Sequence, residues 1–90
     1  MTEVRNDTAR SRYEADVGGA TAVLTYRLSD GEVAFLHTET PPAARGQGIA
    51  SKLARAALDD ARAQGRKVRP YCSFVRDYIA RHPEYQDLLP

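Results

Sequence analysis

The feature that most constrains this chain is a stretch with two glycines at the start of a segment with helical spacing, Arg45-Gly46-Gln47-Gly48-Ile49-Ala50. The first turn of a helix has N–H groups without intrahelical partners and carries the positive end of the helix dipole. Glycines at this point leave those N–H groups uncovered, and Arg45 adds a fixed positive charge. This combination is typical of a phosphate or pyrophosphate site. The alternative is a turn that binds nothing and only lets the chain reverse.

The residues around the glycines exclude two common phosphate motifs. No Gly-Lys-Ser/Thr triplet follows, so the stretch is not a P-loop. A third glycine at the required offset is also missing, which excludes the dinucleotide-binding fingerprint. An anion site here would therefore belong to a different class of protein.

Length and composition predict a small globular domain. The chain has 90 residues, of which 42% are hydrophobic and 28% are charged. These values predict one domain over residues 1–90, in which the polar residues 1–8 are loose. A formal net charge of +1 gives no overall field that would attract nucleic acid, so we expect no nucleic-acid partner.

Cysteine and histidine usage predicts the compartment and argues against a metal. Cys72 is the one cysteine, so it has no partner for an internal disulfide, which is typical of a reducing compartment. The two histidines are far apart, which argues against a structural zinc site. There is no apolar run as long as a membrane span and no secretory signal at the N-terminus. We expect a cytosolic protein without a membrane partner, and the oligomeric state stays open.

The first half of the chain has the pattern of an antiparallel meander. Alternation of apolar and polar residues predicts strands over residues 12–16, 21–28 and 32–38. Gly18-Gly19 marks the first connection, and Asp30-Gly31 is a strong hairpin signal at the second. These three strands are therefore predicted to pair in sequence order.

Helical spacing replaces the alternation after the glycine stretch. Apolar residues, mostly alanine and leucine, recur three and four positions apart and predict a helix that runs from residue 50 to near Gln64. Gly65 is a suitable C-terminal cap for it. The many alanines favour a helix and allow it to approach a sheet closely.

A strand and a second helix complete the predicted fold. The pattern predicts a strand over residues 67–71 and a helix that Ser73 caps and that ends before Pro83. The predicted class is α+β, an α/β sandwich in which an antiparallel meander is followed by helix, strand and helix on a mixed sheet.

The glycine stretch and several later segments of the sequence resemble those of a known family. The glycine stretch is similar to the acetyl-CoA signature of the GNAT superfamily of N-acetyltransferases, Arg/Gln-x-x-Gly-x-Gly/Ala, with Arg45, Gly48 and Ala50 on its three defined positions. The resemblance is to small, single-domain GNAT-like proteins. It extends over roughly residues 10–90 through further segments in the same order, residues 37–42, 70–75 and 82–85.

The resemblance implies a short GNAT core that binds acetyl-CoA and transfers acetyl to a primary amine. It places the pyrophosphate on the N–H groups of residues 45–50. It places the pantetheine arm in a splay between the strand that ends near His37 and Thr38 and the strand over residues 67–71. Larger relatives build the acceptor site with additional N-terminal helices, for which this chain has too few residues. We therefore expect a shallow acceptor site and an extended substrate, such as a protein lysine or N-terminus.

Cys72 is the first candidate catalytic residue. It follows a predicted strand at the mouth of the second helix, where the helix N-terminus and nearby Arg69 and Arg76 favour the thiolate form. A thiolate here can act as a nucleophile that carries the acetyl group. The alternative is a small buried side chain that fills a gap in the core.

His37 is the second candidate, as a general base. It is the histidine near the predicted splay, and histidine changes its protonation state close to neutral pH. Glu39 is placed to orient the imidazole. The alternative is a histidine that hydrogen-bonds to backbone at the end of a strand.

Lys52 and Arg76 are candidates, with Arg45, for contact with the 3′-phosphate of CoA, and the alternative for each is a solvated surface charge. The leading functional prediction is an N-acetyltransferase. A non-catalytic acyl-CoA-binding module is the alternative. A nucleic-acid binder that uses the basic residues 65–69 is the least favoured reading, because the net charge is close to zero.

Overall fold

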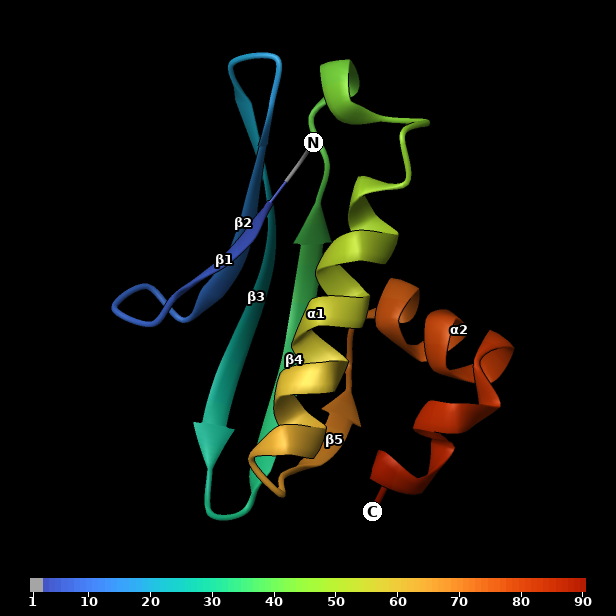
Figure 1. Ribbon diagram of the computed structural model, residues 1–90. Helices are drawn as coiled ribbons and strands as arrows, with labels where there is room; N and C mark the ends of the chain where they lie inside the picture. The colour runs from blue at the N-terminus through green and yellow to red at the C-terminus, as the bar shows by residue number, and fades with distance from the viewer. Residues whose placement is uncertain (1–2) are drawn as a thin grey trace.

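A mixed sheet of five strands, in the order β1-β2-β3-β4-β5, forms the centre of the computed structural model, which describes residues 3–90 (Figure 1). The first four strands pair antiparallel, and β4 pairs parallel with β5. The helix α1 connects β4 to β5 and lies across one face of the sheet, while α2 packs beside α1 and β5. The elements are β1 (Val4–Asp7), β2 (Arg12–Val17), β3 (Ala20–Ser29), β4 (Glu32–Glu39), η1 (Pro42–Ala44), α1 (Ile49–Ala63), β5 (Lys67–Pro70), α2 (Ser73–Arg81) and η2 (Pro83–Leu88).

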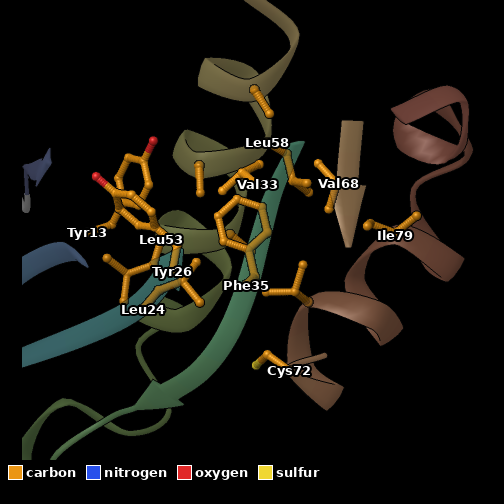
Figure 2. Packing of buried hydrophobic residues seen from close by; sticks show 14 of the residues in the cluster. Tyr13, Leu24, Tyr26, Val33, Phe35, Leu53, Leu58, Val68, Cys72 and Ile79 are labelled. Carbon is orange, nitrogen blue, oxygen red and sulfur yellow. The ribbon is translucent and has the colours of Figure 1, made fainter. Parts of the chain in front are cut away.

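One hydrophobic core lies between the sheet and the two helices. Alternate residues of the strands face α1, because side chains on a strand point to opposite faces in turn. The buried stripe of α1 has the helical spacing seen in the sequence, and Figure 2 shows Phe35 at the centre of this packing, with Val68 and Ile79 on the side of α2. The largest fully buried side chains are Phe35, Leu24, Leu53, Leu58, Ile79, Val68 and Val75.

A β-bulge interrupts β4. Tyr26 of β3 pairs with Phe35, but Thr25 pairs with His37, so Leu36 is an extra residue without a partner in β3. An extra residue reverses the alternation of faces beyond it. Thr38 consequently shares the helix-covered face with Leu24, whereas His37 lies on the opposite face of the sheet.

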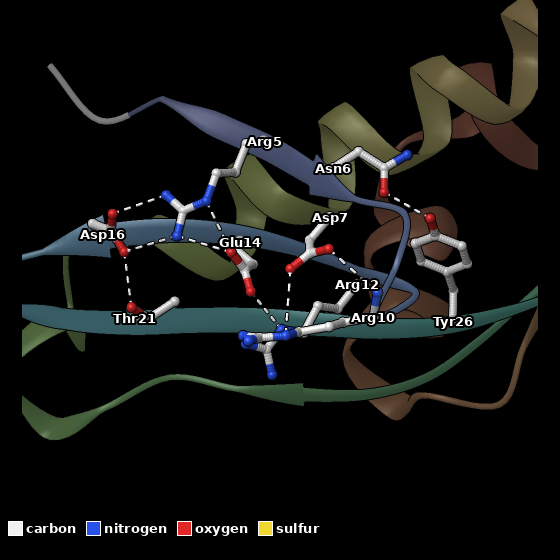
Figure 3. A network of polar contacts seen from close by, with 9 residues as sticks. All are labelled: Arg5, Asn6, Asp7, Arg10, Arg12, Glu14, Asp16, Thr21 and Tyr26. Atoms are coloured by element: carbon white, nitrogen blue, oxygen red, sulfur yellow. Dashed lines mark hydrogen bonds and ion pairs between the residues drawn. The ribbon is translucent and has the colours of Figure 1, made fainter.

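The face of the sheet opposite the helices carries paired charges. Arg5 of β1 donates to Glu14 and to Asp16 of β2, each at 2.8 Å, and Arg12 donates to the other oxygen of Glu14 (Figure 3). Glu14 is 4% exposed, so its two arginine partners compensate a buried carboxylate. On β5, Arg69 pairs with Glu32 of β4 at 3.1 Å.

The structure confirms the α+β class, the mixed sheet and the four predicted strands and two helices within a few residues. The prediction that residues 1–8 are loose is wrong for residues 4–7, which form β1; residues 1 and 2 lie outside the described residues. This strand has little apolar patterning because its side chains pair with charges on β2. Ser73 is also not the cap of α2: Cys72 occupies that position, without a side-chain hydrogen bond.

Two further observations concern the ends and surroundings of the chain. Gly65 follows α1 with φ +68°, and the N–H of Arg66 reaches back to the carbonyl of Ala61 at 2.9 Å, so the predicted glycine cap is confirmed. No helix within residues 3–90 has the length and apolar character needed to span a membrane. The cytosolic location stays a prediction.

The C-terminal segment η2 is held against α1 by hydrogen bonds of Tyr85 and Asp87. The Tyr85 hydroxyl donates to Asp59 at 2.7 Å, and Arg62 donates to both carboxylate oxygens of Asp87 at 2.9 Å. The ring of Tyr85 is buried and lies 5.9 Å from the Arg62 guanidinium. These contacts hold η2 against the C-terminal part of α1.

Alkaline pH is expected to destabilise this attachment. Burial, and then the hydrogen bond to Asp59, raise the pKa of Tyr85 from 10.0 to about 12. The stability that depends on a neutral hydroxyl is therefore complete below about pH 10 and is lost as the pH rises to about 12. Urea unfolding at increasing pH should show this loss, and Tyr85→Phe should reduce its slope. Tyr71→Phe, which changes an exposed tyrosine, is the control, and equal slopes for all three proteins would contradict the assignment.

Candidate functional site

The glycine loop between η1 and α1 presents backbone N–H groups to open space. Gly46 and Gly48 have φ values of +80° and +71°, which residues other than glycine adopt only with strain. A Cβ atom at either position would meet no heavy atom within 4 Å. Gly48 is the N-cap of α1, no side chain caps this end, and the first turn contains no acidic residue. The N–H groups at the start of α1 are thus available to an anion.

Side chains from the loop itself fix its shape. The guanidinium Nε of Arg45 donates to the carbonyl of Thr40 at 3.2 Å, and the Gln47 amide donates to the carbonyl of Ala43 at 3.0 Å. Ile49 is buried and anchors the first turn of α1 in the core. The loop is therefore held at both ends, while its glycines remain exposed.

Two adjoining hollows lie in front of this loop and continue along α2. The first has a volume of about 310 Å³ and is lined by the glycine loop, Ala50, Ser51 and Phe74. The second, of about 220 Å³, shares Ser51 and Phe74 and ends at Arg81 and His82. An extended ligand can lie along both, and the second hollow sets the carboxylate of Asp77 beside the cation of Arg81. Ser51 and Phe74 were not among the predicted site residues, and their one signal in the sequence is their position at the starts of the two helices.

The bulge and the end of β5 open a splay in the sheet. Pairing between β4 and β5 stops at Phe35 and Pro70, and the chain then turns into α2. The N–H of Cys72 donates to the carbonyl of Phe35 at 2.9 Å and marks the apex of the splay. Beyond it, residues 36–39 of β4 have no register partner in β5. This is the arrangement that the family resemblance implied between these two strands.

Cys72 and Thr38 meet at this apex. The Cys72 sulfur lies 3.0 Å from the Thr38 hydroxyl oxygen, and the residue is 6% exposed. Arg69, which the sequence analysis placed near the thiol, instead pairs with Glu32 on the opposite face of the sheet. That expectation is wrong, because alternation along β5 turns Arg69 away from the face on which Val68 packs. The second predicted cation, Arg76, is exposed one turn further along α2.

His37 lies on the other face of the sheet from Cys72. Its imidazole is 65% exposed, and Nε2 lies 3.6 Å from a carboxylate oxygen of Glu39, so the predicted pair is brought together. The structure does not bring His37 and Cys72 onto one face. A catalytic role for either residue stays a prediction.

The remaining predicted contacts divide into two groups. Thr38 and the stretch from Arg45 to Ala50 lie along the splay and the glycine loop. Lys52 and Arg76 are exposed, and neither lines either of the two adjoining hollows. The basic residue that lines the second hollow is Arg81. Among residues 3–90, no group of three or more His, Cys, Asp or Glu side chains is placed to hold a metal ion.

The sheet, the glycine loop and the splay together define an acetyltransferase fold. A family model with the description GCN5-related N-acetyl-transferase matches residues 12–88. The chain therefore belongs to this family, and the resemblance seen in the sequence is confirmed.

Relatives and a solved structure support the same assignment. Protein NATD1 of Gallus gallus is 34% identical over 84 residues, which cover 90% of this chain and 76% of that protein. Protein NATD1 of Homo sapiens is 35% identical over 83 residues, which cover 89% and 74%. The solution structure of a GCN5-like protein from Staphylococcus aureus matches with a TM-score of 0.75 and 28% identity, over 98% of this chain and 87% of that one.

The Thr38 hydroxyl is expected to control the reactivity of Cys72. A thiolate is the reactive form of cysteine, and only the hydroxyl can donate between the two groups when the thiol has lost its proton. Because a hydrogen bond to a charged group contributes about 1.5–3 kcal/mol, Thr38→Val should slow alkylation of Cys72 by iodoacetamide about tenfold. Intact-protein mass follows the reaction. Thr25→Val, on the opposite face, should keep the normal rate, and an unchanged rate in Thr38→Val would contradict the proposed contact.

Proposed function

We propose that this protein is an acetyl-CoA-dependent N-acetyltransferase that acts on a primary amine. The observation that carries the proposal is the uncapped start of α1, where Gly46 and Gly48 expose the N–H groups of the first turn beside an open hollow. Membership of the GCN5-related family supports acetyl transfer as the reaction.

The residues present fit the chemistry of an acetyl-CoA molecule. The pyrophosphate would be held by the N–H groups at the start of α1, with the fixed charge of Arg45 beside it. The nucleotide end would follow the second hollow, where Tyr78 and His82 are stacked with ring centroids 3.9 Å apart and Arg81 supplies a positive charge. The pantetheine arm would lie along the unpaired edge of β4 beyond Phe35. Its amide groups would find free backbone partners there.

The side chains at the splay can perform the transfer in two ways. Bound acetyl-CoA supplies an acetyl group activated as a thioester. In one route the Cys72 sulfur attacks the thioester carbonyl, and CoA leaves as the thiol with the proton that Cys72 gives up. The amine then attacks the new thioester, and Cys72 is released as the thiol. In the other route the amine attacks the acetyl-CoA thioester directly, CoA leaves as the thiol, and Cys72 only packs against Thr38. In both routes the amine gives up a proton, for which His37 Nε2, oriented by Glu39, is the available base on the open face of the sheet.

The open face of the sheet supports an extended acceptor. His37 and Glu39 are both more than half exposed, and no layer covers their side of the sheet within residues 3–90 (Figure 1). A small amine would find little enclosure there, whereas a peptide segment can make contacts along the strands. A protein lysine or N-terminus is therefore the acceptor class that we propose.

Gly48→Ala is expected to separate ligand binding from folding. Alanine at a positive φ costs about 1–2 kcal/mol, and the added methyl group lies in the space in front of the first turn. Gly31→Ala is a matched control, because Gly31 has a φ of +69°, open space around it and a place in the distant β3–β4 turn. Both variants should melt at a lower temperature than the unmodified protein.

Only Gly48→Ala should lose stabilisation by acetyl-CoA. A ligand at about 100 times its Kd adds about 2.7 kcal/mol, which raises the Tm of a domain of this size by about 10–20 °C. Thermal melts with acetyl-CoA, CoA, ATP and NAD measure this shift, which we expect with the two CoA species. An equal rise of the Tm in both glycine variants would show that the loop does not bind the ligand.

Intact-protein mass should separate the two routes. We assign Cys72 as the group that receives the acetyl, so rapid acid quenching after mixing with acetyl-CoA should show one added acetyl group. Cys72→Ala should show none and should lose activity on peptide amines. Unmodified Cys72 in an active protein would establish direct transfer. Absence of any acetylated product with a wide panel of amines, combined with normal acetyl-CoA binding, would favour the alternative of a non-catalytic binding module.

A further inference from the structure

A separate cavity lies at the end of α1 opposite the glycine loop. It has a volume of about 270 Å³ and extends from the core residue Phe35 to the last turn of α1 and the residue after Gly65. It shares no lining residue with the hollow in front of the glycine loop. Neither the family assignment nor the proposed acetyl transfer gives this cavity a role.

Part of the cavity wall is apolar. This apolar part includes the rings of Tyr13, Tyr26 and Phe35 together with Leu28, which is 48% exposed. The two tyrosine hydroxyls already donate hydrogen bonds. The Tyr13 hydroxyl donates to Asp60 at 2.9 Å. The Tyr26 hydroxyl donates to Asn6 at 2.6 Å (Figure 3). The tyrosines therefore offer ring surfaces to a ligand, and their hydroxyl protons are not available to it.

The polar part of the lining includes one charged side chain, that of Arg66. Arg66 is partly buried and donates to the side-chain oxygen of Gln64, which is also a lining residue. Within residues 3–90 no carboxylate oxygen lies within 4.0 Å of the Arg66 guanidinium, in contrast to Arg5, Arg62 and Arg69. A partly desolvated guanidinium without an ion-pair partner attracts a planar anion such as a carboxylate.

The cavity volume limits the size of the ligand. Since a water molecule accounts for about 30 Å³ of liquid volume, 270 Å³ corresponds to about nine water molecules, which is room for a compact ligand with a single ring. We propose that this cavity binds a compact monocarboxylate with an apolar, aromatic or aliphatic body, which packs on the tyrosine rings and pairs with Arg66. The proposal is independent of acetyl-CoA binding, because the two sites occupy opposite ends of α1.

Titration with a series of matched probes tests the charge and the site together. 3-Phenylpropionate is the carboxylate probe, and 3-phenylpropylamine and 3-phenylpropanol have the same apolar body with a cationic or a neutral group. In ¹⁵N–¹H correlation spectra we expect saturable shifts of the amide signals of Ser11, Gln64 and Arg66 with the carboxylate, while the signals of Gly46 and Gly48 stay in place. No saturable shift at these positions with the carboxylate would overturn the proposal.

Two variants and a control locate the binding. Arg66→Gln should weaken the affinity for 3-phenylpropionate about tenfold, because it removes a charge-assisted hydrogen bond. Arg55→Gln is the control, since Arg55 is an exposed residue of α1 that does not line the cavity. Ala61→Leu should fill the cavity and abolish binding while the spectrum remains that of a folded protein. Equal affinity for the amine and the carboxylate, or unchanged affinity in Arg66→Gln, would overturn the assignment.

Discussion

The single extra residue in β4 is the constraint on which the candidate site depends. β4 must pair with β3 along its whole length but with β5 only as far as Phe35. Without the bulge, strict alternation would place His37 on the face of Phe35 and turn Thr38 away from Cys72. The bulge reverses these positions. It therefore creates both sides of the splay at once, a thiol and hydroxyl on the helix side and an imidazole and carboxylate on the open side.

Much of this arrangement follows from local patterns that act over a few residues. The alternation of apolar residues located the central strands, the spacing of alanines and leucines located α1, and the two glycines located the open start of that helix. Each of these signals is read from neighbours in the sequence, and the structure agrees with them. The resemblance to the GNAT signature then supplied the class of reaction.

The features that escaped prediction depend on contacts between distant segments. β1 has the composition of a loop, and it becomes a strand because Arg5 finds Glu14 and Asp16 on the next strand. The sequence pattern does not indicate the bulge, because Leu36 and His37 fit a regular strand with alternating faces. Arg69 was assigned to the thiol by its sequence distance, which says nothing about the face of the strand on which it lies.

The two edges of the sheet have a further consequence. Each edge strand, β1 and β5, is four residues long; β1 carries Arg5 and Asp7, and β5 ends at Pro70, which has no N–H to offer. Short, charged or proline-terminated edges are poor templates for another strand. The protein can thus leave the end of β4 unpaired on the side of β5, as its site requires, without a long exposed strand edge. Such an edge would allow copies of the protein to pair and aggregate.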